Sequence, residues 1–241
     1  TLKMLKRWEV IAAGGQPLNI CEEMMRLTME IVGKALFNVD LSQETNVLGQ
    51  AYKTMANYVE YRLNAVFHVP LFMPTPRNRA LKRAITDINQ FLQDTIDERR
   101  QKGNQAHDLM AMLLEARDEE TGKGMTDQQL RNELLAMIGA GYETTAAALP
   151  WTFYLLWQHP RVAQKLWAEL ETVLGGSIPT IADLPNLTYL RQVSEEALRL
   201  YPPFWSLAVR EAIADERFGD YHLPAGSSVL IIPYALHRDP R

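Results

Sequence analysis

The stretch Met137-Ile-Gly-Ala-Gly-Tyr-Glu-Thr-Thr-Ala-Ala-Ala-Leu149 decides how the whole chain is interpreted. It lies inside a long run of apolar residues at helical spacing, which begins after Thr126, a good N-cap, and ends at His159-Pro160. A glycine in a helix interior costs about 1 kcal/mol relative to alanine, so Gly139 and Gly141 need a physical reason. Small residues allow another group to approach the helix main chain closely.

An acid and a hydroxyl, Glu143 and Thr144, follow these glycines directly. A carboxylate can shuttle a proton, and a hydroxyl both donates and accepts one. One interpretation is therefore a helix that crosses the face of a bulky planar ligand, with a proton-handling pair beside it. The alternative is close helix–helix packing at the glycines, with Glu143 on a solvated face. Taken alone, the stretch slightly favours packing, because contacts between small residues are common.

The composition is that of an ordinary globular protein: the 241 residues are 47% hydrophobic and 22% charged, enough to bury a sizeable core. A net charge of −4 gives no reason to expect a nucleic-acid partner. No apolar run reaches the ~18 residues of a membrane span, and no secretory signal pattern is present, so we expect a cytoplasmic protein. The single cysteine, Cys21, excludes an internal disulfide, and the scattered histidines suggest no metal site.

Both ends of the sequence look cut. The chain opens at Thr1 rather than at methionine, and it stops at Arg241 directly after a strand-like run. We therefore expect a fragment that is incomplete at both ends.

The expected fold class is mainly α, with a small β region at 204–232 that follows helices over 1–200. Turn and capping signals predict helices over residues 2–13, 19–37 with Asn19 as N-cap, 42–67, 77–102, 107–116, 126–158, 160–174 and 188–200. Short strands are predicted at 207–210, 221–223 and 229–232, with turns at Gly219 and 224–226. Pro150 is expected to kink the central helix.

A second constellation lies on the last of these helices. Glu196 and Arg199 are three residues apart and can pair, and Pro202-Pro203 stops the helix just after them. Alone such a pair means little, because exposed pairs contribute little to stability.

Together these residues resemble the cytochrome P450 superfamily, in particular its soluble bacterial members. The family's central-helix motif corresponds to Ala140-Gly141-Tyr142-Glu143-Thr144, and its Glu-x-x-Arg helix corresponds to Glu196-Ala-Leu-Arg199. Arg210, 219–226 and 237–240 look like the family's β segments and the turn before its haem loop. The resemblance covers the whole chain, as a partial domain over 1–241.

The resemblance implies a role for each of these residues. Ala140, Gly141 and Thr144 would lie against the haem, and Glu143 with Thr144 would deliver protons to dioxygen. Glu196 and Arg199 would form a buried structural pair behind the haem. The remaining implied contacts are Arg210 at a haem propionate and a substrate pocket lined by Phe204, Trp205, Ser206 and Leu207.

One departure concerns the iron ligand. The family uses a cysteine thiolate, and Cys21 lies in the early helices, far from every motif, so we expect the ligand to be absent from this sequence. The 215–218 segment, Asp-Glu-Arg-Phe, looks like another family signature, but it precedes 237–240, which is the wrong order, and we interpret it as coincidence.

The resemblance implies a haem-thiolate monooxygenase that inserts one atom of dioxygen into a small apolar substrate. Electrons would come from NAD(P)H through a ferredoxin, a flavodoxin or a fused reductase, and the fragment alone would be inactive. One alternative is a haem-free helical fragment without catalysis. Another is a haem-thiolate isomerase or peroxygenase, against which the presence of both Glu143 and Thr144 argues.

Overall fold

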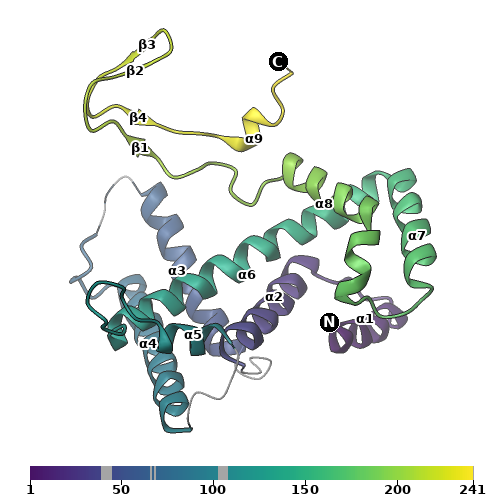
Figure 1. The fold of residues 1–241 in the computed structure, drawn as a ribbon, viewed down its shortest axis with the longest axis horizontal. Helices are drawn as coiled ribbons and strands as arrows, with labels where there is room; N and C mark the ends of the chain where they lie inside the picture. The colour runs from purple at the N-terminus through teal and green to yellow at the C-terminus, as the bar shows by residue number, and fades with distance from the viewer. Residues whose placement is uncertain (39–44, 66, 68, 103–107, 241) are drawn as a thin grey trace. The chain divides into compact units, whose positions relative to one another are not determined.

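The computed structural model describes residues 1–38, 45–65, 67, 69–102 and 108–240, and it is mainly α-helical, as the sequence predicts (Figure 1). The helices are α1 (Leu2–Ala13), α2 (Ile20–Phe37), α3 (Thr45–Asn64), α4 (Pro76–Lys102), α5 (Leu109–Glu115), α6 (Asp127–Gln158), α7 (Pro160–Leu174), the 3-10 helix η1 (Ile181–Asn186), α8 (Thr188–Leu200) and α9 (Pro233–Leu236). The predicted first residues of two helices, at 42 and 107, lie outside the described residues.

Local signals fix several helix ends where the sequence places them. The Asn19 side chain accepts a hydrogen bond from the Glu22 main-chain N–H at the start of α2, at 3.4 Å. At the start of α6, the Thr126 N–H donates to Gln129 Oε1 at 2.9 Å, and the Gln129 N–H donates back to Thr126 Oγ1 at 3.3 Å, which completes the predicted capping box. Gly175 ends α7 with φ 54°, a left-handed conformation that favours glycine.

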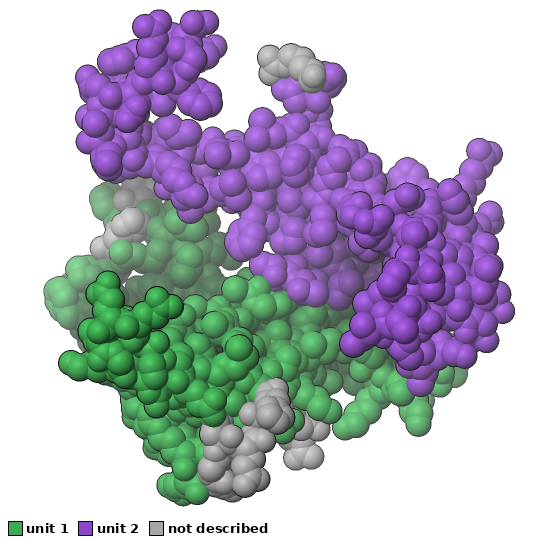
Figure 2. Space-filling view, viewed as in Figure 1, with its two compact units in different colours: residues 1–143 green, residues 144–241 purple. Residues whose placement is uncertain are grey.

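The chain forms two compact units, residues 1–143 and 144–241, which Figure 2 colours separately. The central helix α6 contributes to both, because the boundary falls between Glu143 and Thr144. The helix continues through Pro150.

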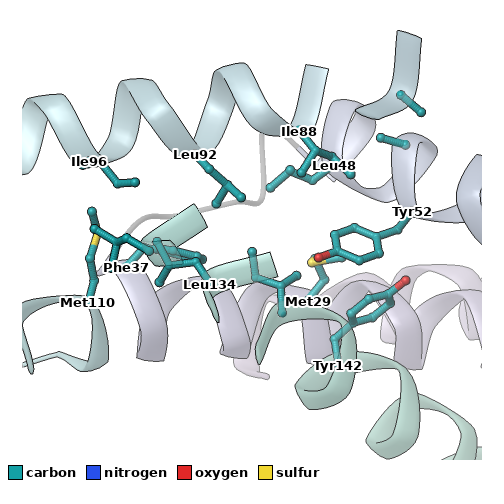
Figure 3. Close-up of a cluster of buried hydrophobic side chains, with 14 residues drawn as sticks. Met29, Phe37, Leu48, Tyr52, Ile88, Leu92, Ile96, Met110, Leu134 and Tyr142 are labelled. Carbon is teal, nitrogen blue, oxygen red and sulfur yellow. The ribbon is translucent and has the colours of Figure 1, made fainter. Parts of the chain in front are cut away.

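The first unit has a contiguous hydrophobic core built by α2 to α6 (Figure 3). Each helix contributes one buried stripe, as helical periodicity requires. Fully or almost fully buried members are Met29, Phe37, Leu48, Ile88, Leu92, Ile96, Met110, Leu130, Leu134 and Ile138. This core fixes the first half of α6.

The small β region of the second unit differs from the predicted strands. It consists of two antiparallel pairs, β1 (Arg210–Glu211) with β4 (Ser228–Val229) and β2 (Glu216–Phe218) with β3 (Tyr221–Leu223). The prediction was wrong for 207–209 and 230–232, which are not strand, although the Leu207 N–H still donates to the Ile231 carbonyl at 2.8 Å. Strand β2 was missed, because its residues were interpreted only as a misplaced family signature.

Turns in this region follow the prediction. Gly219 has φ 60° between β2 and β3, and Gly226 has φ 80° before β4. Both conformations lie in the left-handed region, where a glycine has no steric cost.

Candidate active site on helix α6

The middle of α6 has one buried and one exposed side. Ile138, Tyr142 and Ala146 are buried at four-residue spacing, whereas Ala140 and Glu143 are exposed. Thr144, four residues after Ala140 and hence on the same side of the helix, is half-buried. The helix therefore presents the predicted small residue and the acid on an accessible side.

Both glycines face a neighbouring helix, but only Gly141 is in a contact too tight for a Cβ atom. A Cβ atom added at Gly139 would lie 3.4 Å from Cε1 of Tyr52 on α3, and one added at Gly141 would lie 3.2 Å from Cγ2 of Val32 on α2. The second distance is shorter than an ordinary carbon contact, so α2 approaches α6 as closely as it does only because residue 141 lacks a side chain. Of the two interpretations of these glycines, packing is the one that the structure supports directly.

A pair of buried tyrosines lies beside this segment, and sequence reasoning missed its role. The rings of Tyr52 and Tyr142 meet edge to face, with centroids 5.5 Å apart (Figure 3). The Tyr52 hydroxyl donates to the Leu135 carbonyl oxygen at 2.8 Å. Nothing in the sequence pairs Tyr52 with α6, because the two segments are more than eighty residues apart.

Burial raises the pKa of both phenols. For Tyr142, burial raises the pKa to about 12, and the negative charge of Glu143 acts in the same direction. For Tyr52, burial is again the largest cause, and the neighbouring Gly139 main-chain N–H acts against it. Both hydroxyls therefore keep their protons at neutral pH and can act as donors.

Glu196 and Arg199 on α8 pair as predicted, through two hydrogen bonds of 2.6 Å. This bidentate contact holds the pKa of Glu196 below its usual range. The expected burial is not found: the side chains are 54% and 45% exposed. The Arg199 guanidinium makes one further hydrogen bond within the described residues, to the His237 carbonyl at 2.5 Å, and these residues leave about half of each side chain uncovered.

The predicted substrate-pocket residues follow α8 as an extended segment. Phe204, Trp205 and Leu207 are exposed, and Ser206 is half-buried. The Trp205 carbonyl accepts a hydrogen bond from the Tyr234 N–H at 3.3 Å. Aromatic side chains exposed in this way are available to a ligand, but they enclose no cavity by themselves.

Arg210 begins β1, opposite Val229 of β4, and it is exposed. A guanidinium held on a strand in this way suits a planar carboxylate such as a propionate. Its guanidinium has no hydrogen-bonding or ionic partner among the described residues, and its role at a propionate is a proposal.

An apolar groove of about 370 Å³ lies within the second unit, between the end of α6, α7 and α8. Leu155, Val162, Val193 and Leu200 are among its lining residues, together with Glu196 of the ion pair. The predicted pocket residues 204–207 do not line it. The sequence gives no signal for this groove, because it depends on how three helices pack.

A further cluster joins the last described segment to the rest of the second unit. Trp151 on α6 stacks on Tyr201, with centroids 4.1 Å apart, and the Arg238 guanidinium lies 3.7 Å from the centroid of Tyr234. Tyr201 and Tyr234 are themselves 6.4 Å apart. Sequence analysis missed this cluster, whose only signal is an aromatic residue directly before Pro202-Pro203.

Metal and membrane features are not found in the part of the chain that the structure describes. No group of three His, Cys, Asp or Glu side chains there could hold a metal ion. In the same residues, no helix has the length and apolar character needed to cross a membrane. Cys21 is exposed and unpaired at the start of α2.

Comparison with known proteins identifies the family. The model of the protein family described as "Cytochrome P450" matches residues 1–241. Cyclooctat-9-en-7-ol 5-monooxygenase of Streptomyces melanosporofaciens is 36% identical over 227 residues, which cover 94% of this chain and 49% of that protein. Pentalenene oxygenase of Streptomyces avermitilis is 30% identical over 225 residues, covering 93% of this chain and 49% of that protein.

Solved structures agree with this match. The haem domain of a mutant of cytochrome P450DA superposes with a TM-score of 0.87 at 27% identity, covering 98% of this chain and 52% of that one. The chain thus spans about half the length of the relatives that it matches. Because the match to the family extends over residues 1–241 of this sequence, the chain belongs to the cytochrome P450 family.

Proposed function

We propose that this chain is part of a haem-thiolate monooxygenase, which inserts one atom of dioxygen into a small apolar substrate and reduces the other to water. The observation that carries this proposal is the accessible side of α6, which presents Ala140, Glu143 and Thr144 in a chain of the cytochrome P450 family. Two matched relatives are named as a monooxygenase and an oxygenase, which supports the reaction class.

The residues present fit contacts to a haem in part. Ala140 is small and exposed on α6, so a flat group can approach the helix there. Arg210 offers an exposed guanidinium to a propionate. Gly141 would contribute only main chain, because its missing side chain already serves the contact with Val32.

A haem-thiolate enzyme also needs a cysteine thiolate that binds the iron. Cys21, the one thiol of the sequence, lies on α2 in the first unit, next to Glu22 and Glu23. Cys21 lies far along the sequence from every family motif, so we assign it no role at iron. The thiolate ligand is proposed to come from outside these 241 residues.

When bound, the haem supplies the iron that activates dioxygen. The chain's own contribution is proton handling and binding. The Glu143 carboxylate is exposed and can exchange protons with solvent, and the adjacent half-buried Thr144 hydroxyl can pass a proton inward along the helix. Phe204, Trp205 and Leu207 supply exposed apolar surface for a substrate, with the half-buried Ser206 between them.

Electrons are proposed to come from NAD(P)H through a ferredoxin, a flavodoxin or a fused reductase. The two alternative classes are a haem-free fragment and a haem-thiolate isomerase or peroxygenase. Neither of these needs an acid and a hydroxyl side by side on the accessible side of α6, so the monooxygenase is the reading that this geometry favours.

Isotope labelling of the complete protein tests the reaction class. With ¹⁸O-labelled dioxygen, NAD(P)H and a redox partner, one labelled atom is expected in the product and one in water. Product whose oxygen comes from water or from added peroxide, or rearranged product without new oxygen, would instead identify one of the alternatives. A purified protein that binds no haem would leave the haem-free alternative.

A further inference from the structure

Tyr52 on α3 contacts the main chain of α6 at a carbonyl group inside the helix. In a regular α-helix, the Leu135 carbonyl accepts its hydrogen bond from the Gly139 N–H, four residues on. Here the Tyr52 hydroxyl donates to that same carbonyl oxygen at 2.8 Å. A second donor at a ladder carbonyl draws the carbonyl toward the side chain, a recognised cause of local helix distortion.

Position 139 is the point of α6 that the Tyr52 ring approaches. A Cβ atom added at Gly139 would lie 3.4 Å from Cε1 of Tyr52, an ordinary contact, so only a side chain that extends beyond Cβ would press on the ring. The Tyr142 ring closes the other side of the contact, edge to face with Tyr52. The Tyr52 ring thus lies against position 139 and against the ring of Tyr142.

The contact lies one helical turn before the pair proposed to handle protons. Leu135 and Gly139 precede Glu143 by eight and four residues, so the three lie along one side of α6. Tyr52 is 8% exposed, and its raised pKa keeps the donor proton in place at neutral pH. An uncharged donor with a fixed ring is suited to hold a main chain in one position over the whole working pH range.

We propose that Tyr52 is a positioning residue for the reaction: its hydroxyl fixes the α6 main chain at Leu135 and Gly139 and thereby sets the placement of Glu143 and Thr144. This inference rests on the proposed monooxygenase function. It also links α3 to the proton-handling segment, so that a displacement of α3 alters proton delivery without any change of the acid or the hydroxyl.

The experiment compares Tyr52→Phe with Tyr142→Phe in the complete, haem-loaded protein. Both variants keep a buried ring of the tyrosine pair, but only the first removes the donor to Leu135. Amide hydrogen exchange over 135–144 is measured first, since it needs no catalysis. A lost hydrogen bond should speed exchange there by about 3- to 10-fold in Tyr52→Phe, and by less than about twofold in Tyr142→Phe.

Coupling, the product formed per NAD(P)H consumed, is measured on the same samples together with the substrate KM. We expect Tyr52→Phe to lower coupling with KM unchanged, and Tyr142→Phe to leave both near wild type. Unchanged exchange in Tyr52→Phe would overturn the proposal whatever the activity. Faster exchange with wild-type coupling, or failure of Tyr52→Phe to fold, would show that the hydroxyl is only structural and would overturn it as well.

The two proposals fail in different ways. If the wild-type protein incorporates no oxygen from dioxygen, the proposed function is wrong, and exchange still decides whether Tyr52 fixes α6. If oxygen is incorporated but exchange does not respond to the loss of the hydroxyl, only the positioning role is wrong.

Discussion

The two units differ in what their side chains are used for. In residues 1–143, helices α2 to α6 bury a contiguous core in which Leu92, Ile96 and Leu134 are fully enclosed. In the described part of residues 144–241, the buried hydrophobic side chains are few: Ala146, Leu166, Leu187 and Ala197. Large apolar side chains such as Trp167 and Phe204 are exposed there instead.

This difference separates stability from function along α6. The first half of the helix is held by a core, so its residues are constrained by packing. Thr144, Arg210 and the segment 204–207 belong to the unit with little core of its own, whereas Ala140 and Glu143 lie at the end of the first unit. Truncation of core side chains in the first unit should therefore act mainly on folding, and substitution of the side chains proposed for the site should act mainly on catalysis.

The largest effect is expected from a core truncation in the first unit. Leu134→Ala removes a fully buried side chain and should lower the free energy of unfolding by about 2–5 kcal/mol. Trp167→Ala in the second unit is the matched control. Its side chain is 70% exposed, so a change within about 0.5 kcal/mol is expected. Urea unfolding followed by circular dichroism measures both, and equal losses would remove the contrast between the units.

The next largest effect on stability is expected from a buried acid on α2 that contacts α1. Glu23 accepts hydrogen bonds from Trp8 Nε1, at 2.8 Å, and from the Arg7 guanidinium. Burial acts to raise the pKa of Glu23, but these bonds and the charges of Arg7 and Arg26 outweigh it and hold the pKa below its usual range. A lowered pKa stabilises the fold above the unfolded value of about 4.3, and this contribution is lost as the pH falls through the folded value.

Glu23→Gln should therefore cost about 1–3 kcal/mol at neutral pH and should flatten the fall in stability between about pH 5 and pH 3. Glu22→Gln, an exposed neighbour on the same helix turn, should leave that slope unchanged. Melting temperatures across this pH range provide the measurement. A slope that is the same in Glu23→Gln and wild type would mean that other carboxylates control the acid sensitivity.

A smaller effect distinguishes the two glycines of α6. Gly141→Ala places a methyl group 3.2 Å from Val32 Cγ2, so the Val32 side chain must move slightly. Gly139→Ala meets Tyr52 at 3.4 Å, close to an ordinary contact, and it gains helix propensity. We expect Gly141→Ala to be about 1 kcal/mol less stable than Gly139→Ala in thermal unfolding. The reverse order would show that the ring of Tyr52 yields less readily than Val32.

Much of the helical frame could be predicted from the sequence, because its signals are local. Asn19, the Thr126–Gln129 capping box, Pro160 and Gly175 each mark a helix end through contacts with near neighbours. The ion pair Glu196–Arg199 was predictable for the same reason, being three residues apart on one helix.

Features that depend on distant segments could not be predicted in the same way. Nothing in the sequence joins Tyr52 to Leu135, or Val32 to Gly141, because these contacts form only when α2 and α3 pack on α6. The strands were predicted too long at 207–209 and 230–232. Apolar and β-branched residues there favour a strand, but few neighbouring segments pair with them. The exposure of the Glu196–Arg199 pair also depends on what packs against α8.

The central claim is that the α6 segment Glu143–Thr144 delivers protons, and it is tested most directly by coupling in Thr144→Ala and Thr145→Ala. The half-buried Thr144 loses only a hydroxyl, so haem and substrate binding should stay intact. Coupling should fall, with more of the electrons released as hydrogen peroxide, whereas the exposed Thr145 should matter much less. Equal coupling in wild type and Thr144→Ala would contradict the claim and leave this stretch of α6 as packing.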